Sequence, residues 1–280
     1  MTPTGGTTGQ SDTYALIGHP VARSRSPGLH GALFAAAGID AVYVCFDVAP
    51  EAAGAAVSAV RTLGLAGANL TVPFKESVLP HLDGLTEAAR AAGSANTVFW
   101  RGQRLIGDNT DGVGLLDAVR EARGHWDGPA VVLGAGGSAR AVASALHAAG
   151  CPEVTVLNRT VQRAERVAAS IGCVAGPLSR EGFRRAADGA AIVVNCTAGA
   201  AAPLIGELPV SALGPGTLWV DTNYWMERPP QRDACGAVGV RFLTGHSMLL
   251  HQGVRAWTRW TGKVPGPEAL QAARAAVEGR

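Results

Sequence analysis

Along the first half of the chain, short apolar runs alternate with alanine-rich segments whose apolar residues recur at helical spacing. Apolar runs of this length, bounded by glycine, proline or polar residues, are typical of strands. The pair Ser26-Pro27 precedes the first helical segment, and a proline in the first turn favours a helix start. The predicted strands are Tyr14–Gly18, Val42–Val48 and Ala66–Val72, and the predicted helices are Gly28–Ala37 and Glu51–Leu63.

The second half repeats this alternation after residues 124–129, which contain glycine and proline. The segment Asp111–Arg123 has a helical pattern and links the two series, and alanine-rich helices that carry tryptophan follow from about Met248. Because strands that alternate with helices form mostly parallel sheets, we predict an α/β protein with two α/β lobes and a cleft between them. The strands predicted in the second series are Ala130–Leu133, Val154–Leu157, Ala191–Asn195 and Leu218–Asp221.

Size and charge narrow the class of protein. With 280 residues, of which 47% are hydrophobic, the chain can bury one large or two small cores. The formal net charge is only +2, and basic residues neither form blocks nor alternate with aromatic ones, so nucleic-acid binding is not indicated. No apolar run reaches the ~18 residues that a membrane span requires.

Cysteine and histidine spacing argues against disulfides and metals. The five cysteines are scattered and never form a C-x-x-C pair, which fits a reducing cytoplasm. His246 and His251 are five residues apart and therefore do not share a helical face as metal ligands would. Residues Met1–Ser11 are rich in threonine and glycine and lack the basic and apolar regions of a signal peptide, so we expect a disordered leader there.

A glycine-rich turn follows the first strand of the second series. The strand Ala130–Leu133 leads into Gly134-x-Gly136-x-x-Ala139 and then into a helix that runs through Leu146. Glycines let the backbone approach a pyrophosphate, and a helix N-terminus offers N–H groups and a partial positive charge to phosphates. This context favours a dinucleotide site over the alternative, a glycine-rich turn without a ligand.

The end of the next strand indicates which dinucleotide binds. An NAD enzyme would place Asp or Glu against the ribose 2′-hydroxyl here, whereas this chain has Asn158-Arg159-Thr160 and then Arg163. Guanidinium groups bind a 2′-phosphate that a carboxylate would repel, so NADP is preferred over NAD. The alternative is that both arginines are solvated surface charges. The two segments predict cofactor contacts at Gly134, Ala135, Gly136, Gly137, Ser138, Ala139, Asn158, Arg159, Thr160 and Arg163.

Hydroxyl, amide and lysine side chains occur at strand ends and in loops of the first series, where sites are common. A small polyhydroxylated carboxylate requires such groups, since each buried substrate hydroxyl needs a partner. Taken singly, the serines could cap the helix after Pro27, the asparagines could stabilise turns, and the lysine could be an exposed surface residue. The residues concerned are Ser24, Ser26, Asn69, Thr71, Lys75, Asn96, Asn109 and Asp111.

The order of these motifs resembles the shikimate dehydrogenase family from about Tyr14 to Pro265. The chain departs from the family pattern at Arg23, where the family usually has histidine, at Gly253, which replaces the usual alanine, and in the segments Asn195–Gly199 and Tyr224–Pro230. The matching elements are Gly18-His19-Pro20-Val21 with Ser24-x-Ser26-Pro27, Asn69–Lys75, Asn96-Thr97, Asn109–Gly112, Gly134–Ala139, Asn158-Arg159-Thr160 and Gly245–Gln252.

The resemblance implies an N-terminal substrate-binding domain, a C-terminal Rossmann-type domain and the reversible, NADPH-dependent reduction of 3-dehydroshikimate to shikimate in aromatic biosynthesis. It further implies that Ser24 and Ser26 hold the substrate carboxylate. Contacts to the ring hydroxyls are implied for Thr71, Lys75, Asn96, Asp111, Tyr224 and Gln252, and further cofactor contacts for Thr197, Gly245 and Met248.

For the chemistry, we expect Lys75 to donate the proton to the developing alkoxide and Asp111 to orient the lysine. The expected domains are a substrate-binding catalytic domain over 12–110, a connecting helix over 111–123, an NADP-binding domain over 124–245, and helices over 246–280 that pack back on the first domain. A catabolic quinate or shikimate dehydrogenase, an enzyme for an aminated shikimate analogue, and a ligand sensor without chemistry stay open as alternatives, as does a homodimer.

Overall fold

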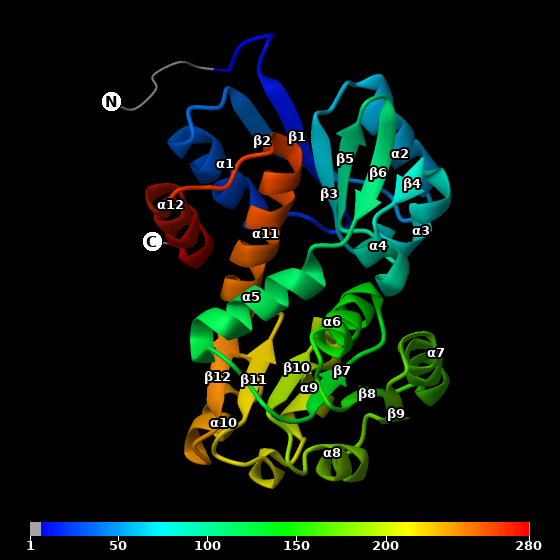
Figure 1. The fold of residues 1–280 in the computed structure, drawn as a ribbon, viewed down its shortest axis with the longest axis vertical. Helices are drawn as coiled ribbons and strands as arrows, with labels where there is room; N and C mark the ends of the chain where they lie inside the picture. The colour runs from blue at the N-terminus through cyan, green and yellow to red at the C-terminus, as the bar shows by residue number, and fades with distance from the viewer. Residues whose placement is uncertain (1–6, 280) are drawn as a thin grey trace. The chain divides into compact units, whose positions relative to one another are not determined.

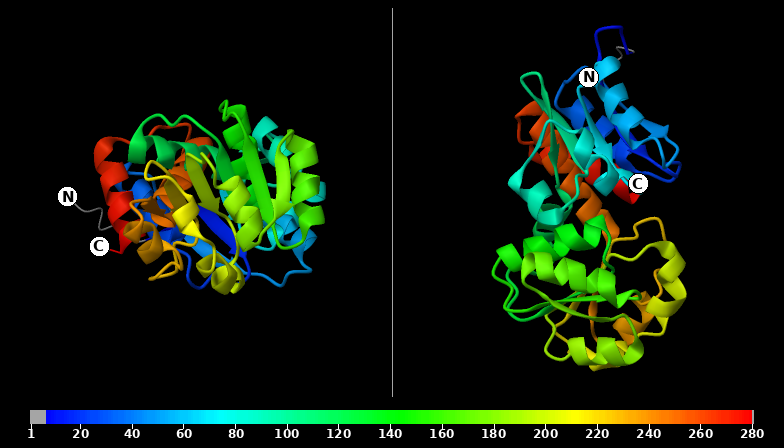
Figure 2. Two further views of the ribbon diagram at one scale, coloured as in Figure 1. Left: turned by 90° about the horizontal axis from the view of Figure 1, so that it is seen from below. Right: turned by 90° about the vertical axis from the view of Figure 1, so that its right-hand side faces the viewer.

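The computed structural model describes residues 7–279, which form two compact units (Figure 1). The first unit ends at Thr110 and resumes at Leu249, and the second unit is Asp111–Met248. Each unit is a sheet flanked by helices, as Figure 2 shows from two further directions. Among residues 7–279, no helix combines the length and the apolarity that a membrane crossing requires.

The first unit is built on a six-stranded sheet with the order β2-β1-β3-β5-β6-β4. β1 pairs in parallel with β2 and β3, whereas β5 is antiparallel to both of its neighbours, β3 and β6. The apolar end of β1 is buried throughout, as expected for a strand with a neighbour on each side. The strands are β1 (Asp12–Gly18), β2 (Ala41–Asp47), β3 (Gly67–Leu70), β4 (Gly84–Leu85), β5 (Thr97–Arg101) and β6 (Arg104–Asp108).

Helices of the first unit start and stop where the local sequence favours it. Pro27 lies in the first turn of α1, and Thr86 caps α4 because its hydroxyl accepts a hydrogen bond from the Ala89 N–H (3.2 Å). The last two helices return from the end of the chain, and α12 packs against α1. The helices are α1 (Ser26–Ala36), α2 (Ala53–Thr62), α3 (Phe74–Ser77), η1 (Leu79–His81), α4 (Glu87–Ala92), α11 (Gly245–Thr261, which begins in the second unit) and α12 (Pro267–Glu278).

The second unit is a fully parallel sheet with the order β12-β11-β10-β7-β8-β9. This is the doubly wound order of dinucleotide-binding domains. Alternate residues of β7 lie in two separate apolar clusters, one on each face: Ala130 and Val132 in one, Val131 and Leu133 in the other. The strands are β7 (Ala130–Leu133), β8 (Val154–Asn158), β9 (Val174–Pro177), β10 (Ile192–Asn195), β11 (Leu218–Asp221) and β12 (Arg241–Thr244).

Helices cover both faces of the second sheet. Residues of α5, α6 and α7 supply one apolar cluster, and residues of α8, α9 and α10 supply the other. α5 lies close to α6 because Gly112 has no side chain; a Cβ there would overlap the Ala141 carbonyl oxygen. The helices are α5 (Asp111–Arg123), α6 (Gly137–Ala148), α7 (Val161–Ile171), α8 (Arg180–Ala186), η2 (Gly199–Ala201), α9 (Ala202–Gly206), η3 (Val210–Ala212) and α10 (Arg232–Ala237).

The predicted strands and helices are all present, with ends that differ by no more than three residues, and the predicted α/β class with two parallel-rich sheets is confirmed. The helix Asp111–Arg123, expected as a connection, belongs to the second unit. The pattern analysis missed the antiparallel pair β5–β6, which a two-residue turn containing Gly102 (φ +61°) joins. It also missed the short strands β4, β9 and β12, which are too brief to show a period.

The leader expected over Met1–Ser11 is described only in part. Residues 1–6 lie outside the described residues. Contrary to the expectation of disorder, Thr8–Ser11 form a turn in which the Ser11 N–H donates to the Thr8 carbonyl (3.2 Å). The Ser11 hydroxyl also donates to the Asp40 carboxylate (2.6 Å), which ties this turn to the first unit.

Candidate active site

One edge of the first sheet collects several of the predicted substrate residues. β3 and β6 end at this edge, and β5, being antiparallel to both, begins there. Thr71 and Lys75 follow β3, Asn96 precedes β5, and Thr110 follows β6. The residues that flank these three strands are therefore neighbours in space although they are far apart in sequence.

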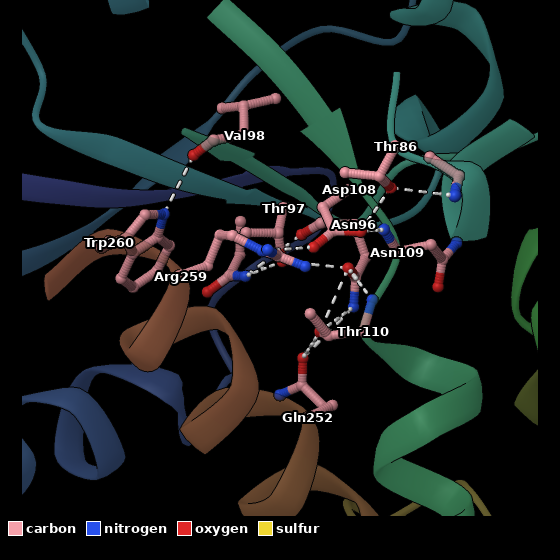
Figure 3. Close-up of polar contacts among 12 residues, drawn as sticks. Thr86, Asn96, Thr97, Val98, Asp108, Asn109, Thr110, Gln252, Arg259 and Trp260 are labelled. Atoms are coloured by element: carbon pink, nitrogen blue, oxygen red, sulfur yellow. Dashed lines mark hydrogen bonds and ion pairs between the residues drawn. The ribbon is translucent and has the colours of Figure 1, made fainter. Parts of the chain in front are cut away.

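Asn96 is the centre of a hydrogen-bonded network at this edge (Figure 3). The residue is 3% exposed, and its Oδ1 accepts hydrogen bonds from the Thr110 N–H (2.8 Å) and the Thr97 hydroxyl (3.0 Å). Its Nδ2 donates to the Thr110 hydroxyl (3.0 Å) and to Gln252 Oε1 (3.3 Å). Asn96, just before β5, and Gln252 of α11 are both predicted substrate residues, and a direct hydrogen bond thus holds them together.

Asn69 supports this network from behind. Its buried side chain accepts a hydrogen bond from the Tyr43 hydroxyl (2.8 Å) and donates to the Asn96 carbonyl (3.1 Å) and the Thr97 hydroxyl (3.0 Å). We listed Asn69 with the candidate substrate residues and in the Asn69–Lys75 motif, and we did not predict a supporting role for it. The signal was available, because a polar residue inside an apolar strand needs a buried partner.

An aromatic layer lies under Asn69. The imidazole of His30 is fully buried and stacks on Tyr43, with 4.4 Å between ring centroids. Burial lowers the pKa of His30 to about 3, and the nearby Asn69 side chain acts weakly in the opposite direction. The ring is consequently neutral wherever the protein is folded at ordinary pH.

Lys75 lies in the short helix α3, half-buried, at the same sheet edge. The preceding residue, Phe74, is fully buried in the core, and the Lys75 carbonyl accepts a hydrogen bond from the Ala95 N–H (2.7 Å). The lysine backbone is therefore fixed from both sides, directly beside Asn96. The ammonium group is carried by a turn that cannot shift without disturbing Asn96.

The two predicted carboxylate-binding serines lie at the start of α1. Ser24 is partly exposed, and its hydroxyl accepts a hydrogen bond from the Ser26 N–H (3.2 Å). The residue at the N-cap position of α1 is Arg25, whose side chain donates instead to the Val277 carbonyl (2.7 Å). Ser24 thus takes part of the capping role named as its alternative.

In the second unit, the glycine-rich turn has the geometry of a phosphate cradle. Gly134 has φ +109°, which strains any other residue, and a Cβ there would lie only 3.2 Å from the Cys196 backbone. Gly136 precedes α6 with open space where its Cβ would be. Ala139 is fully buried and lets α6 pack closely on the sheet. These residues fit a bound pyrophosphate.

The end of β8 carries exposed positive charge. Arg159 and Arg163 are exposed, and among the described residues neither forms an ion pair with a carboxylate. Asn158 donates from its side chain to the Thr160 carbonyl (3.0 Å), which shapes the turn before α7. Solvated, unpaired guanidinium groups at this strand end fit an additional phosphate.

A second polar network, which we did not predict, joins the ends of β10 and β11. Asp221 is 1% exposed and accepts hydrogen bonds from the Asn195 side chain (2.9 Å) and from the Asn223 N–H (2.9 Å) and side chain (2.8 Å). Asn195 in turn accepts from the Thr197 hydroxyl (2.7 Å). The position of Asp221 at a strand end was the only signal for this network.

The remaining predicted residues lie near this network or in the core. Tyr224 contacts Trp225 edge to face at 5.2 Å, and Gly245 has backbone oxygens of Asp221 and Thr222 within 3 Å of where its Cβ would be. Met248 is 6% exposed and packs in an apolar cluster of the second unit, so its cofactor contact stays a prediction.

The predicted pair of catalytic residues is divided between the units. Lys75 belongs to the first unit and Asp111 to the second, where Asp111 accepts a hydrogen bond from the Ser138 hydroxyl (3.1 Å). Their pairing stays a prediction. Ser138 belongs to the glycine-rich turn, so Asp111 is linked directly to the predicted cofactor-binding segment.

Three family models match successive parts of the chain. Residues 16–98 match the shikimate dehydrogenase substrate-binding domain, residues 118–221 match shikimate/quinate 5-dehydrogenase, and residues 245–278 match the shikimate 5′-dehydrogenase C-terminal domain. The matches leave out the segment that contains Asn109 to Gly112.

Known proteins resemble the chain over nearly its whole length. Shikimate dehydrogenase (NADP(+)) of Rhodospirillum rubrum is 43% identical, with 98% of this chain and 99% of that protein covered. The crystal structure of shikimate 5-dehydrogenase from Thermus thermophilus with NADP(H) and shikimate has a TM-score of 0.83 at 39% identity, covering 95% of this chain and 99% of that one. Quinate dehydrogenase of Corynebacterium glutamicum with NAD has a TM-score of 0.81 at 29% identity, covering 96% and 99%.

These comparisons confirm the resemblance and the fold class inferred from the sequence, together with the enzyme class, an oxidoreductase that acts on a CH–OH group, and NADP as the cofactor. The chain belongs to the shikimate dehydrogenase family.

Proposed function

We propose that the protein catalyses the reversible, NADPH-dependent reduction of 3-dehydroshikimate to shikimate, with Lys75 as proton donor and Asp111 as its partner. The observation that carries the proposal is the position of Lys75 beside the Asn96 network. The lysine backbone bonds to Ala95, and the next residue, Asn96, bonds to Thr110 and Gln252. A proton donor and a set of hydroxyl-binding groups thus share one sheet edge.

Each part of the chain has a defined task in this proposal. The network of Asn96, Thr110 and Gln252 binds the ring hydroxyls, because amide and hydroxyl groups can both donate and accept hydrogen bonds. Ser24 and Ser26 bind the carboxylate, and Thr71 and Tyr224 contact further ring hydroxyls. The ammonium of Lys75 stabilises negative charge on the carbonyl oxygen and then gives up its proton to that oxygen. Asp111 orients the lysine.

The chemistry that NADPH supplies when bound is a hydride for the ring ketone. The turn Gly134–Ala139 would hold its pyrophosphate, because the first glycine keeps the backbone open and α6 begins there. Arg159 and Arg163 would hold the 2′-phosphate, and Thr197, Gly245 and Met248 would line the nicotinamide side. The first part of the chain, 12–110, is the substrate-binding domain in this proposal, and 124–245 is the cofactor-binding domain.

Replacing Lys75 tests the mechanism, and the chain offers a matched control. Lys75 and Lys263 are the only lysines in the sequence, and Lys263 is exposed. Lys75→Ala is expected to lower turnover by about 10² to 10⁴-fold, since general acid catalysis is lost, with NADPH affinity nearly unchanged. Lys263→Ala should leave both unchanged. Normal turnover of Lys75→Ala would remove the lysine from the mechanism.

Quinate oxidation is the second candidate, favoured by the likeness to a quinate dehydrogenase that was solved with NAD. The exposed arginines at the end of β8 argue for NADP instead. Monitoring nicotinamide absorbance with shikimate, quinate and an aminated analogue, each with NADP and with NAD, ranks the candidates. Activity with quinate and NAD alone would replace the proposal, and binding without turnover would favour a sensor.

Two further features are proposed with this function. A cytoplasmic location follows from the scattered cysteines, and a homodimer is the assembly to test. Light scattering coupled to size-exclusion chromatography measures the mass of the assembly directly.

A further inference from the structure

Asp108 is a buried carboxylate immediately before the Asn109–Gly112 motif, and no site has been assigned to it. Its side chain is 3% exposed, and its two oxygens accept hydrogen bonds from different parts of the first unit. Oδ1 accepts hydrogen bonds from the Thr86 hydroxyl (2.5 Å) and the Asn109 N–H (2.9 Å). Oδ2 accepts a hydrogen bond from Arg259 Nε (2.8 Å), so the carboxylate joins the end of β6 to α11.

Arg259 lies on the same face of α11 as Gln252. The two residues are seven positions apart, which is close to two full helical turns, so their side chains point in similar directions. The next residue, Trp260, donates from its indole to the Val98 carbonyl (2.9 Å), which attaches the same end of the helix to β5. The guanidinium of Arg259 also lies 5.3 Å from the ring centroid of Phe99.

These contacts form a closed ring that includes Asn96 (Figure 3). From Asn96 the ring passes to Gln252 (3.3 Å), along α11 to Arg259, to Asp108 (2.8 Å), and through Asn109 and Thr110 back to Asn96 (2.8 Å). A closed ring of contacts fixes the positions of its members more tightly than an open chain does. Asp108 and Arg259 are its only charged members, and the Asp108 carbonyl accepts a hydrogen bond from the Asn96 N–H (3.0 Å).

We propose that Asp108 and Arg259 are positioning residues whose ion pair holds the Gln252 carboxamide and the Thr110 loop in register for the substrate hydroxyls. The inference rests on the proposed function. The pair should therefore set the affinity for shikimate and leave the affinity for NADPH unchanged. A pair that only stabilised the fold would alter the melting temperature and neither affinity.

The two partners can be separated by substitution. Asp108→Asn keeps an oxygen for Thr86 and Asn109 but turns an amide toward Arg259, which breaks only the bond to α11. Arg259→Met keeps the length of the side chain and removes the charge, which leaves a buried carboxylate without its cation. The double variant removes both charges, so it avoids that cost and folds even if Arg259→Met does not.

A second arginine provides a matched control. Arg61 also pairs with an aspartate, Asp83 (2.9 Å), and its guanidinium lies 5.9 Å from the ring centroid of Trp100 on the same strand β5. Its guanidinium donates hydrogen bonds to the Asp83 carboxylate (2.9 Å) and to the His81 carbonyl (3.3 Å), away from Asn96 and Gln252. Arg61→Met therefore removes a similar pair from the same unit outside the ring.

The experiment measures the KM for shikimate, the KM for NADP and the melting temperature of each variant, together with shikimate binding by calorimetry. Asp108→Asn and the double variant should raise the shikimate KM and Kd about tenfold, as expected for a displaced hydrogen-bonding group, with the KM for NADP unchanged. Arg259→Lys should retain most of the wild-type affinity for shikimate because the positive charge is kept. Arg61→Met should alter neither KM.

The outcomes distinguish this inference from the proposed function. Wild-type enzyme that oxidises shikimate, with unchanged shikimate KM in the double variant, overturns the positioning role and leaves the function standing. Wild-type enzyme that neither oxidises nor binds shikimate overturns the function and this inference with it. An equal rise in both KM values would show a general loss of structure and would also contradict the inference.

Discussion

The two units present polar groups in opposite ways. In the first unit, Asn69, Asn96 and Thr110 are no more than 5% exposed and bond to one another. In the second unit, the arginines at the end of β8 are exposed and, among the described residues, have no carboxylate partner. A buried network of neutral groups must be complete before a substrate arrives, because unsatisfied buried groups are costly, whereas charges that bind a phosphate can stay solvated until it does.

This difference predicts how substitutions combine. Members of one hydrogen-bonded network depend on each other, so the losses of activity caused by single substitutions in the first unit should not be additive. The two exposed arginines at the end of β8 act mostly through their own contacts to a phosphate, so the losses of cofactor affinity caused by replacing them should be close to additive. Additive losses in the first unit, or non-additive losses in the second, would contradict this distinction between the units.

The largest effect is expected at Asn96. Asn96→Ala leaves the Thr110 N–H and the Thr97 hydroxyl without their acceptor. The value of kcat/KM for shikimate should fall by about 10² to 10³-fold, the equivalent of roughly 3 to 4 kcal/mol. Gln252→Ala alone should cause a smaller loss, and the double variant should lose scarcely more than Asn96→Ala does. Steady-state kinetics of the four proteins gives this comparison.

A control for Asn96 should lose a buried hydrogen bond without touching the network. Thr217 precedes β11 in the second unit, is 2% exposed and donates to the Ala190 carbonyl (2.7 Å). Thr217→Val should lower the free energy of unfolding by about 1 kcal/mol and leave the shikimate kinetics unchanged. Strictly additive losses in Asn96→Ala and Gln252→Ala would mean that the network does not act as one unit.

A moderate effect is expected at the end of β8. Arg159→Ala should raise the KM for NADPH by about 10- to 100-fold, because hydrogen bonds to charged groups contribute roughly 1.5 to 3 kcal/mol. The KM for NADH should change little, since NADH lacks the additional phosphate. Arg163→Ala should have a similar but smaller effect, and the two losses should add. Steady-state kinetics with NADPH and with NADH gives the ratio of the two KM values for each variant.

Arg184 is the matched control for these arginines. It is exposed, lies in α8 of the same unit and is separated in sequence from the glycine-rich turn. Arg184→Ala should leave both cofactor KM values unchanged. Equal losses with NADPH and NADH in Arg159→Ala would contradict the phosphate-binding role and would assign the residue to the shared part of the cofactor.

The second unit could be predicted from the sequence more fully than the first. Its strands are apolar runs, its turn has a glycine pattern, and Arg159 follows a strand end, so local signals sufficed. The first unit depends on pairs that are distant in sequence: Asn96 and Gln252 are 156 positions apart, and Asp108 and Arg259 are 151 apart. No local pattern records such pairs, since the sequence around one partner gives no sign of the other.

Antiparallel β5 explains much of what the sequence analysis missed. We predicted Asn96 as a substrate residue, but without the turn at Gly102 there was no reason to place it beside the residues that follow β3 and β6. Asp108 was overlooked for the same reason. A carboxylate next to a motif attracts notice only when the partner strand shows that it is buried.

The smallest effect is expected at His30, below the network. The imidazole is neutral when buried, with a pKa of about 3, whereas in the unfolded chain its ordinary value is near 6.5. Between these values the unfolded state binds a proton that the native state does not, so stability falls as the pH drops below about 6.5. From pH 7.5 to 5.5 the expected loss is about 1.4 kcal/mol.

His30→Phe tests this, because phenylalanine keeps a ring to stack on Tyr43 and cannot be protonated. Urea unfolding of both proteins across pH 5.5 to 8.5 should give curves of stability against pH that run parallel above pH 7.5 and separate below pH 6.5, with the wild type losing more. Parallel curves throughout would show that the imidazole is protonated or hydrated in the native state. The layer of His30 and Tyr43 below Asn69 would then be open to solvent, like the arginines of the second unit. The two units would in that case differ only in the charge of their polar groups.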